Sequence, residues 1–134
     1  MSEHTVQYYE TDKMGVTHHS NYIRWMEEAR VEFLKKIGWD YAKLEELGIV
    51  SPVLSVACEY KIPTYFSEQI LIDVKITDYK GVKLSLAYEM KNEKGEVVCT
   101  GTSKHAFLNT QGRPVRMKQE YPAFDETLRS LLSS

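Results

Sequence analysis

The feature that most limits the fold is a change of hydrophobic period at Gly48. Before this glycine, apolar residues recur at steps of three and four. After it, they alternate with polar residues in four runs, at residues 54–62, 70–76, 82–90 and 97–108. Alternation with a period of two is typical of strands that bury one face, and the turn-forming residues between the runs favour antiparallel connections. We therefore expect four long antiparallel strands in a meander.

A long amphipathic helix is predicted before these strands, over residues 21–37. Its apolar residues form one face, on which Arg30 is the single charged exception. Ser20 or Asn21 is suited to cap its start, because their side-chain oxygens accept free backbone N–H groups. Gly38 can close its end in a left-handed conformation. A short strand is expected at residues 5–9.

Two weaker helices complete the prediction. One covers residues 40–47 and ends at Gly48. The other lies in the tail, at residues 121–132, where Pro122 precedes four apolar residues. One helix with a wide apolar face must cover one sheet, so an α+β fold is expected. The length of 134 residues suits a single domain over 1–134, with a short helix within residues 120–134.

The composition excludes several partners. The net charge of −2 gives no electrostatic reason to expect nucleic acid or an anionic membrane. Cys58 and Cys99 lie inside apolar runs and lack the paired spacing of a zinc site or a redox motif, which favours free thiols in a reducing compartment. No signal peptide and no membrane-spanning run is recognisable, so we expect a cytoplasmic protein that does not insert into membranes.

The polar segment at residues 8–22, YYETDKMGVTHHSNY, lies directly before the long helix and carries the candidate chemistry. Asp12 is followed by Gly15, which permits a tight turn or a close approach to a ligand. Free N–H groups at a helix start bind anions, including an oxyanion that develops during acyl transfer. A carboxylate, a turn and a helix start are the parts needed to hydrolyse an activated acyl group. However, an Asp before a Gly turn is also common turn chemistry.

The histidines are less informative. His18 and His19 could act as a base or a hydrogen-bond donor, but adjacent residues rarely bind one metal ion, and no further Cys or His lies at ligand spacing. We therefore expect no metal site and no dissociable cofactor.

The pattern Tyr-x-Glu-Thr-Asp-x-Met-Gly within residues 8–22 resembles the 4-hydroxybenzoyl-CoA thioesterase family of hotdog-fold acyl-CoA thioesterases. It is most similar to the bacterial branch that accompanies the Tol–Pal system. The helix segment YIRWMEEAR, residues 22–30, and the segment FLNTQGRPVR, residues 107–116, continue the resemblance.

The resemblance implies a hotdog fold, in which a curved, five-stranded antiparallel sheet wraps around one long helix. It also implies homodimers or homotetramers with active sites at the subunit interface, and an acyl-CoA substrate. Asp12 matches the catalytic acid of the family. His19 matches the position whose backbone N–H polarises the thioester carbonyl, and Tyr9 matches a tyrosine of the Tol–Pal branch.

Other residues are weaker candidates for substrate binding. Gly15 lies next to the catalytic acid, and Asn21 either orients the helix start or caps it, with capping favoured. Trp25 could line an acyl pocket, although packing at an interface is favoured. Arg113, Arg116 and Lys118 form a basic cluster that could bind the CoA phosphates, although a solvated charge cluster is the more common outcome.

Three functions compete with acyl-CoA hydrolysis. Hydrolysis of acyl carrier protein thioesters would share the mechanism and differ in the carrier. A binding module without turnover is disfavoured by the presence of Asp12, Gly15 and His19 together. A dehydratase would need a His–Asp or His–Glu pair, which His19 and Asp12 do not obviously supply. The acyl group, the role of Asp12 as nucleophile or base, and the choice between dimer and tetramer remain open.

Overall fold

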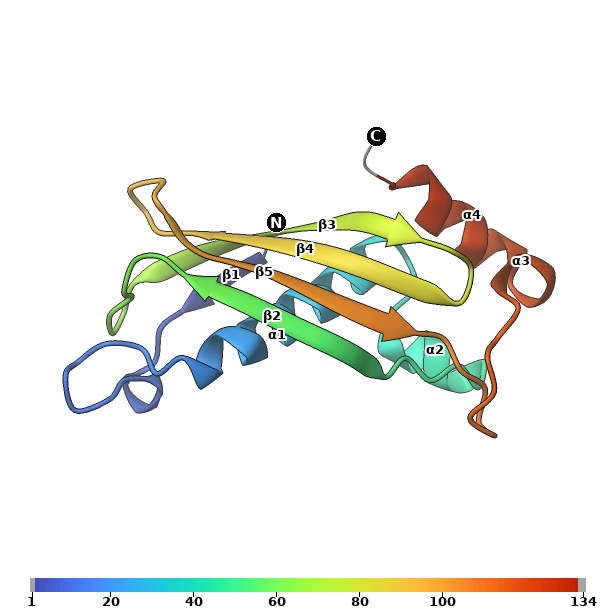
Figure 1. The fold of residues 1–134 in the computed structure, drawn as a ribbon, viewed down its shortest axis with the longest axis horizontal. Coiled ribbons are helices and arrows are strands. Elements are labelled where there is room, and N and C mark those ends of the chain that lie inside the picture. The colour runs from blue at the N-terminus through green and yellow to red at the C-terminus, as the bar shows by residue number, and fades with distance from the viewer. Residues whose placement is uncertain (1, 133–134) are drawn as a thin grey trace.

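The computed structural model describes residues 2–132 and consists of one antiparallel sheet with helices on one side of it. In Figure 1, the long helix α1 runs behind the sheet, and the terminal helices lie at its right-hand end. The elements are β1 (Ser2–Thr5), a 3₁₀ turn (Tyr8–Glu10), α1 (Ser20–Lys36), α2 (Tyr41–Glu46), β2 (Val53–Tyr60), β3 (Gln69–Tyr79), β4 (Lys83–Lys91), β5 (Val97–Ala106), α3 (Met117–Glu120) and α4 (Pro122–Ser130).

The strand order is β1-β3-β4-β5-β2, so only the last three strands form the expected meander. The prediction that β2 continues this meander is wrong. A strand has two pairing edges, and β3 uses one for β1 and the other for β4. Strand β2 therefore pairs with the free side of β5 and becomes an outer edge of the sheet.

The first strand also differs from its prediction at residues 5–9. Strand β1 ends at Thr5, and Tyr8–Glu10 form a 3₁₀ turn. The side chain of Glu10 causes the change of direction, because its Oε1 accepts the backbone N–H of Gln7 at 2.8 Å. This contact fixes a turn where alternation alone predicts extended chain.

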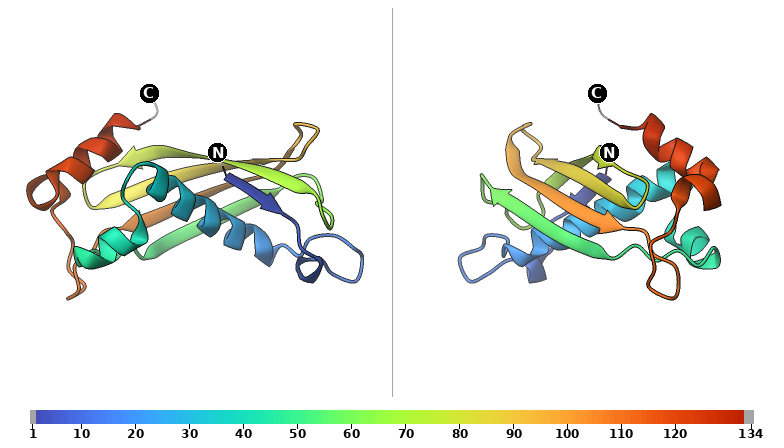
Figure 2. Two further views of the ribbon diagram at one scale, coloured as in Figure 1. Left: turned by 180° about the vertical axis from the view of Figure 1, so that it is seen from behind. Right: turned by 45° about the vertical axis from the view of Figure 1, so that its right-hand side comes forward.

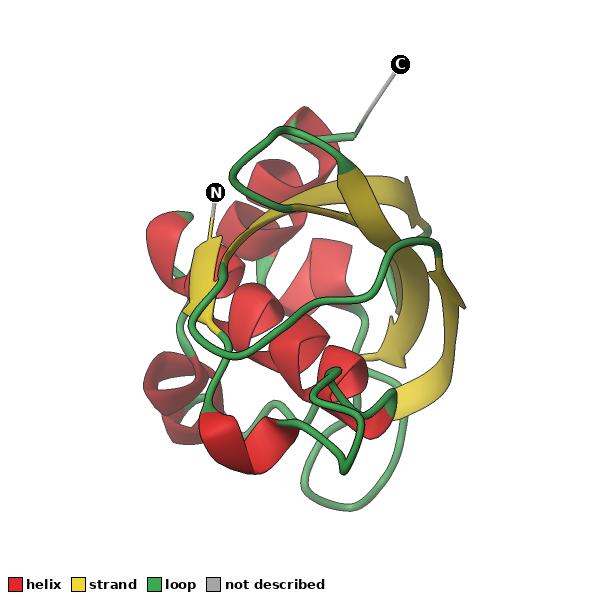
Figure 3. Cartoon of the chain, turned by 90° about the vertical axis from the view of Figure 1, so that its left-hand side faces the viewer, coloured by secondary structure: helices red, strands yellow, loops and turns green. Residues whose placement is uncertain are grey.

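Helix α1 packs against the inner face of the sheet, which curves around it in the end-on view of Figure 3. The predicted alternation is confirmed in β3, β4 and β5, whose inward side chains are buried. Gly101 allows the closest approach of helix and sheet, since a Cβ there would lie 2.9 Å from Met26 Sδ. Arg30, the charged exception on the apolar face, is indeed buried, at 5% exposure.

The predicted helices are confirmed to within two or three residues. Gly38 follows α1 with a φ of +88°, and Asp40 caps α2 by accepting the N–H of Lys43 at 2.9 Å. Helix α4 is fastened to β3, because Tyr79 donates to Asp125 Oδ1 at 2.6 Å. Within residues 2–132, no helix has the length and apolar character needed to cross a membrane.

Viewed from behind, α1 runs diagonally across the sheet, and the loop before it projects beyond the sheet (Figure 2, left). This loop lies close to the end of β2, because Tyr60 donates a hydrogen bond to the carbonyl of His19 at 3.4 Å. The candidate chemistry of the sequence is therefore at one end of the sheet.

Candidate active site

A cavity of about 370 Å³ lies at the start of α1, between this helix and the chain that leaves β2. Asp12 and His19, which the sequence proposes as catalytic residues, both line it. They come from the loop before α1 and from the residue at its start, so the fold of this loop brings them together. The other lining residues are Val16, Thr17, His18, Tyr22, Tyr60, Lys61, Ile62 and Pro63.

Asp12 lies at the first position of a tight turn that closes the loop. The N–H of Gly15 donates to the Asp12 carbonyl at 3.0 Å, and Gly15 has a φ of +81°, which favours glycine. The Oδ1 atom of Asp12 accepts the N–H of Met14 at 2.8 Å. Asp12 is therefore a turn residue, as one of the two interpretations of the sequence held. However, the turn uses only one of its two carboxylate oxygens. Within the described chain, Oδ2 has no hydrogen-bond partner, and the side chain is exposed to the cavity.

The start of α1 is open toward the same cavity. His19 is the capping residue, but it has helical backbone angles and no side-chain capping bond. No acceptor among residues 2–132 faces its own N–H, and the first turn contains no acidic residue. A free N–H group at the positive end of a helix dipole is suited to bind an oxygen that gains negative charge.

The expected cap by Ser20 or Asn21 is absent from α1, so this prediction is wrong. Asn21 instead points backward, and its amide donates to the carbonyls of Glu10 at 3.0 Å and His18 at 3.2 Å. The ring of His18 accepts the N–H of Ser20 at 3.3 Å. Asn21 therefore orients the loop at the helix start, which is the alternative that the sequence analysis ranked second.

Glu10 holds the loop in place and is a residue that sequence reasoning missed. It is 4% exposed, and its carboxylate accepts from His4 Nε2 at 2.8 Å and from Trp25 Nε1 at 2.7 Å. Burial raises the pKa of Glu10, but these bonds and the one from Gln7 outweigh it and leave the pKa below its ordinary value. The only sequence signal was indirect: a buried Trp25 indole N–H requires an acceptor.

A second set of buried hydrogen bonds ties the other side of the loop to the chain after β2. Thr64 Oγ1 donates to Thr17 Oγ1 at 2.6 Å, and it lies 2.9 Å from the hydroxyl of Tyr22. The N–H of Thr17 donates to the carbonyl of Thr64 at 2.9 Å. The cavity therefore has walls from the loop, from α1 and from residues 60–63, and the buried hydrogen bonds of Thr64 connect these walls.

Comparison with known proteins identifies the family. Residues 6–130 match the model of the Thioesterase-like superfamily. The chain belongs to this superfamily. Its relatives include a putative acyl-CoA thioesterase, YneP, from Bacillus subtilis (strain 168), which is 34% identical over 118 residues, covering 87% of this chain and 86% of the relative.

Solved structures of superfamily members confirm the hotdog fold. A DHNA-CoA thioesterase from Staphylococcus aureus superposes with a TM-score of 0.91 at 33% identity, covering 96% of this chain and 87% of that one. The BH1999 gentisyl-coenzyme A thioesterase has a TM-score of 0.85 at 22% identity, covering 96% and 99%. The closer resemblance to the 4-hydroxybenzoyl-CoA and Tol–Pal branch stays a prediction.

Two of the candidate binding residues do not line the cavity of this superfamily member. Trp25 is fully buried in the core, with its indole on Glu10, so it lies neither in an acyl pocket nor at an exposed interface. Tyr9 is 79% exposed on the 3₁₀ turn and is not among the lining residues. Lys61, which the sequence analysis did not single out, is the basic residue at the cavity.

The basic cluster of Arg113, Arg116 and Lys118 lies after β5, at the opposite end of the sheet from the Asp12 loop (Figure 1). All three side chains are exposed. Within one chain, the cluster and the cavity are therefore separated by the length of the sheet. These residues can meet a ligand at Asp12 only if a second copy supplies them.

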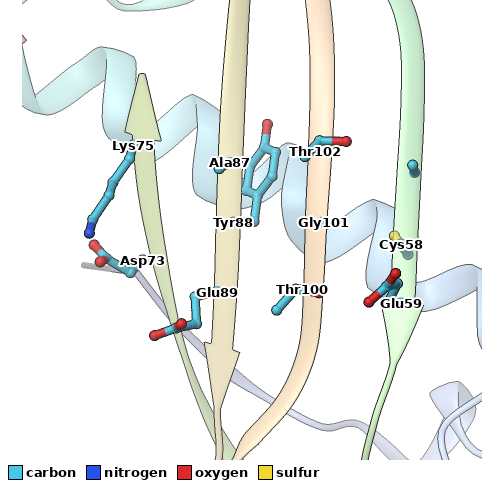
Figure 4. Close-up of a pocket in the computed structure, with 11 residues that line it drawn as sticks. Cys58, Glu59, Asp73, Lys75, Ala87, Tyr88, Glu89, Thr100, Gly101 and Thr102 are labelled. Carbon is cyan, nitrogen blue, oxygen red and sulfur yellow. The ribbon is translucent and has the colours of Figure 1, made fainter. Parts of the chain in front are cut away.

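A larger groove, of about 480 Å³, lies on the outer face of the sheet and does not contain the candidate catalytic residues. Figure 4 shows Asp73, Glu89 and Glu59 there with Lys75, on strands that have α1 behind them. Small side chains such as Ala87 and Thr102 leave this groove shallow and open. It lacks the free N–H groups of a helix start, so the smaller cavity is the better candidate active site.

Proposed function

We propose that this chain is an acyl-CoA thioesterase that hydrolyses its substrate at the start of α1. The observation that carries the proposal is that one cavity is lined by Asp12, whose Oδ2 has no partner in the described chain, and by His19, whose N–H has no acceptor there. One supplies an acid–base or nucleophilic group, and the other supplies an oxyanion donor. The names of the relatives, acyl-CoA and DHNA-CoA thioesterases, support this reaction.

The thioester carbonyl lies over the helix start, with its oxygen on the His19 N–H. The Asp12 carboxylate takes a proton from water, which attacks the carbonyl carbon, or attacks that carbon itself to form an anhydride that water then hydrolyses. In both routes the carbon–sulfur bond breaks and CoA leaves as the thiolate. The Met14 N–H on Oδ1 keeps the carboxylate oriented during either route.

The active unit we propose is a homodimer or homotetramer in which two copies pair along β2. This strand is an outer edge of the sheet and exposes Val53, Leu54, Val56 and Tyr60 at 40% or more. An apolar, unpaired edge strand favours pairing with another chain. A two-fold axis beside β2 reverses the partner, so that its Arg113, Arg116 and Lys118 come to the Asp12 end, where CoA phosphates need cations.

The test of the function is thiol release from short, medium, long and aromatic acyl-CoAs by the wild type and by Asp12→Asn. We expect turnover of at least one ester and a loss of about a hundredfold or more in kcat for the variant. Asparagine can still accept the Met14 N–H, so the turn and the melting temperature should be preserved. Asp40→Asn is a matched control, because Asp40 also accepts a backbone N–H but caps α2.

The alternatives are separated by the same assay. Turnover of acyl carrier protein thioesters alone would replace CoA by that carrier. No turnover of either class, with acyl-CoA still bound, would leave a binding module. Unchanged turnover in Asp12→Asn would contradict the role of Asp12 but not the reaction.

The proposed pairing is tested by the molar mass in solution from light scattering. Leu54→Lys should shift the protein toward the monomer, because it places a charge on the apolar edge. Thr77→Lys adds the same charge to an exposed position on β3 and should leave the assembly unchanged. A wild type that is monomeric at micromolar concentration would contradict this part of the proposal. The cytoplasmic location remains a prediction for cell fractionation.

A further inference from the structure

His4 is a histidine on β1 whose side chain is 11% exposed, and it does not line the cavity at the start of α1. Its Nε2 lies 2.8 Å from Oε1 of Glu10, and its Nδ1 lies 2.9 Å from Oε2 of Glu28. Ionised carboxylates only accept hydrogen bonds, so each ring nitrogen is the donor in its contact. The two contacts therefore fix the orientation of the ring, with Nε2 toward the 3₁₀ turn and Nδ1 toward α1.

The surroundings of His4 hold it in this orientation. Its backbone is paired with Ile70 of β3, and its ring lies against the ring of Trp25 with centroids 4.5 Å apart. A side chain whose backbone, ring face and both nitrogens are engaged has little freedom to change its rotamer. His4 therefore offers Glu10 a hydrogen-bond donor at a fixed place on the sheet.

The carboxylate of Glu10 accepts from donors in different parts of the fold. The N–H of Gln7 belongs to the same turn, and the indole N–H of Trp25 belongs to α1. Among the described residues, His4 is the donor that ties this carboxylate to the sheet. Without it, Oε1 keeps only the bond inside its own turn, and the turn is free to shift relative to β1.

The backbone of Glu10 connects this network to both candidate catalytic groups. Glu10 lies two residues before Asp12 in the sequence, and its carbonyl accepts the N–H of His18 at 2.8 Å, directly before His19. A shift of Glu10 therefore acts on both ends of the loop and changes the distance between the Asp12 carboxylate and the His19 N–H. A misplacement of about 1 Å in an active site can cost about a hundredfold in rate.

We infer that His4 is a positioning residue for thioester hydrolysis: its hydrogen bond to Glu10 holds the loop that places Asp12 and the His19 N–H. His4 lies outside the cavity and acts through Glu10. The separation of the carboxylate from the helix start matters for the transition state more than for holding CoA. Loss of the bond should therefore lower kcat and leave KM nearly unchanged. This inference rests on the proposed thioesterase function.

The test compares His4→Gln with His4→Asn in thiol release from the acyl-CoA that the wild type hydrolyses fastest. The glutamine amide reaches the place of the histidine Nε2 and can still donate to Glu10. The shorter asparagine reaches only the place of Nδ1, toward Glu28. We expect kcat of His4→Asn to fall about tenfold or more, with KM within about twofold of the wild type. His4→Gln should recover most of the lost kcat.

The melting temperature separates positioning from a purely structural role. Both variants lose the ring that packs against Trp25, so both should melt at a lower temperature than the wild type, by similar amounts. If kcat followed the melting temperature and fell equally in both variants, His4 would be structural only and the inference would be wrong. A wild-type kcat in folded His4→Asn would overturn the inference as well.

Backbone amide NMR signals report the state of the loop without turnover. In His4→Asn the signals of Gly15 and His19 should shift, and in His4→Gln they should stay close to their wild-type positions. Glu3→Gln is the control, because Glu3 is exposed on the same strand and its side chain makes no hydrogen bond within residues 2–132. Unshifted loop signals in His4→Asn would contradict the inference.

The two measurements separate this inference from the function on which it rests. A wild type that hydrolyses acyl-CoA, with the same kcat and the same loop signals in His4→Asn, would sink the role of His4 alone. A wild type that hydrolyses no thioester, with loop signals that shift in His4→Asn but not in His4→Gln, would sink the thioesterase function. The support of the loop by His4 would then stand.

Discussion

The two ends of helix α1 are built in opposite ways. At the C-terminal end, Gly38 takes a left-handed conformation, and the N–H of Trp39 returns to the carbonyl of Leu34 at 2.9 Å. Lys35 and Lys36 lie in the last turn, where their positive charges interact favourably with the negative end of the helix dipole. The ring of Trp39 stacks on Phe124 with centroids 4.5 Å apart, so this end is closed by backbone bonds and apolar packing.

The N-terminal end has none of these devices. Its capping residue, His19, makes no side-chain cap, and no acid neutralises the first turn. The loop before it is held indirectly, by the carboxylate of Glu10 and the amide of Asn21. A side-chain cap would make the helix start more stable by about 1 kcal/mol. Without one, the N–H groups of Ser20 and Asn21 bond to His18, and the N–H of His19 has no acceptor in the described chain. The difference shows that the end of α1 at which we propose substrate binding is stabilised by contacts of the preceding loop and has no side-chain cap.

The largest expected effect comes from weakening the support of the open end with Glu10→Gln. The amide cannot satisfy Gln7, His4 and Trp25 together, so the free energy of unfolding should fall by about 2 kcal/mol. The Asp12 loop should also shift, and kcat for thioester hydrolysis should drop between about tenfold and a hundredfold. Urea unfolding and thiol release measure the two effects.

Glu28→Gln is the matched control for this variant. Glu28 accepts from the other ring nitrogen of His4 at 2.9 Å, but its carboxylate is exposed and does not contact the loop. We expect small changes in both stability and kcat. Suppose that Glu28→Gln lowered stability and kcat as much as Glu10→Gln. The loop before α1 would then be held by the carboxylate charges around His4 and not by the hydrogen bonds that Glu10 makes to the loop.

A smaller effect is expected from breaking the closed end with Gly38→Ala. An alanine at a φ of +88° is strained, so the free energy of unfolding should fall by about 1 kcal/mol. Because this end is remote from Asp12, kcat should stay at the wild-type value. Gly38→Asn should lose less stability, since asparagine tolerates the left-handed region. A reduced kcat in Gly38→Ala would show that the two ends are coupled.

The elements that periodicity encodes could be predicted from the sequence. Helix α1 and strands β3, β4 and β5 bury one face each, so their apolar residues recur with the period of the element. Gly38 was also correctly predicted, because the left-handed conformation at a helix end strongly favours glycine. In the candidate site, Asp12 and His19 were found from a motif, and the structure brings them to one cavity.

The features that depend on distant contacts could not be predicted. The place of β2 at the sheet edge follows from the pairing of β1 with β3, which no local pattern encodes. Trp25 was expected at a pocket or an interface, but its burial depends on an acceptor fifteen positions earlier, Glu10. His105, whose Nδ1 is buried without a hydrogen-bond partner in the described chain, lies in β5. The alternation of this strand predicts only that the side chain faces inward. Periodicity shows which side a residue faces, but not which polar atom it meets there.

The smallest expected effect is a difference in acid stability between the two ends. The pKa of Glu10 is below its ordinary value of 4.5, so its contribution to stability is complete above pH 4.5 and is lost as the pH falls through the lowered value. The wild type should therefore lose stability below pH 4.5 more steeply than Glu10→Gln does. The stability of Gly38→Ala should fall with decreasing pH as steeply as that of the wild type. The closed end is held by Gly38, by the carbonyl of Leu34 and by stacked rings, and the variant keeps the carboxylate of Glu10. Asp125 and His105 titrate in all three proteins alike, so urea unfolding above and below pH 4.5 isolates the contribution of Glu10. Parallel slopes in all three proteins would mean that the loop is held without the charge of Glu10.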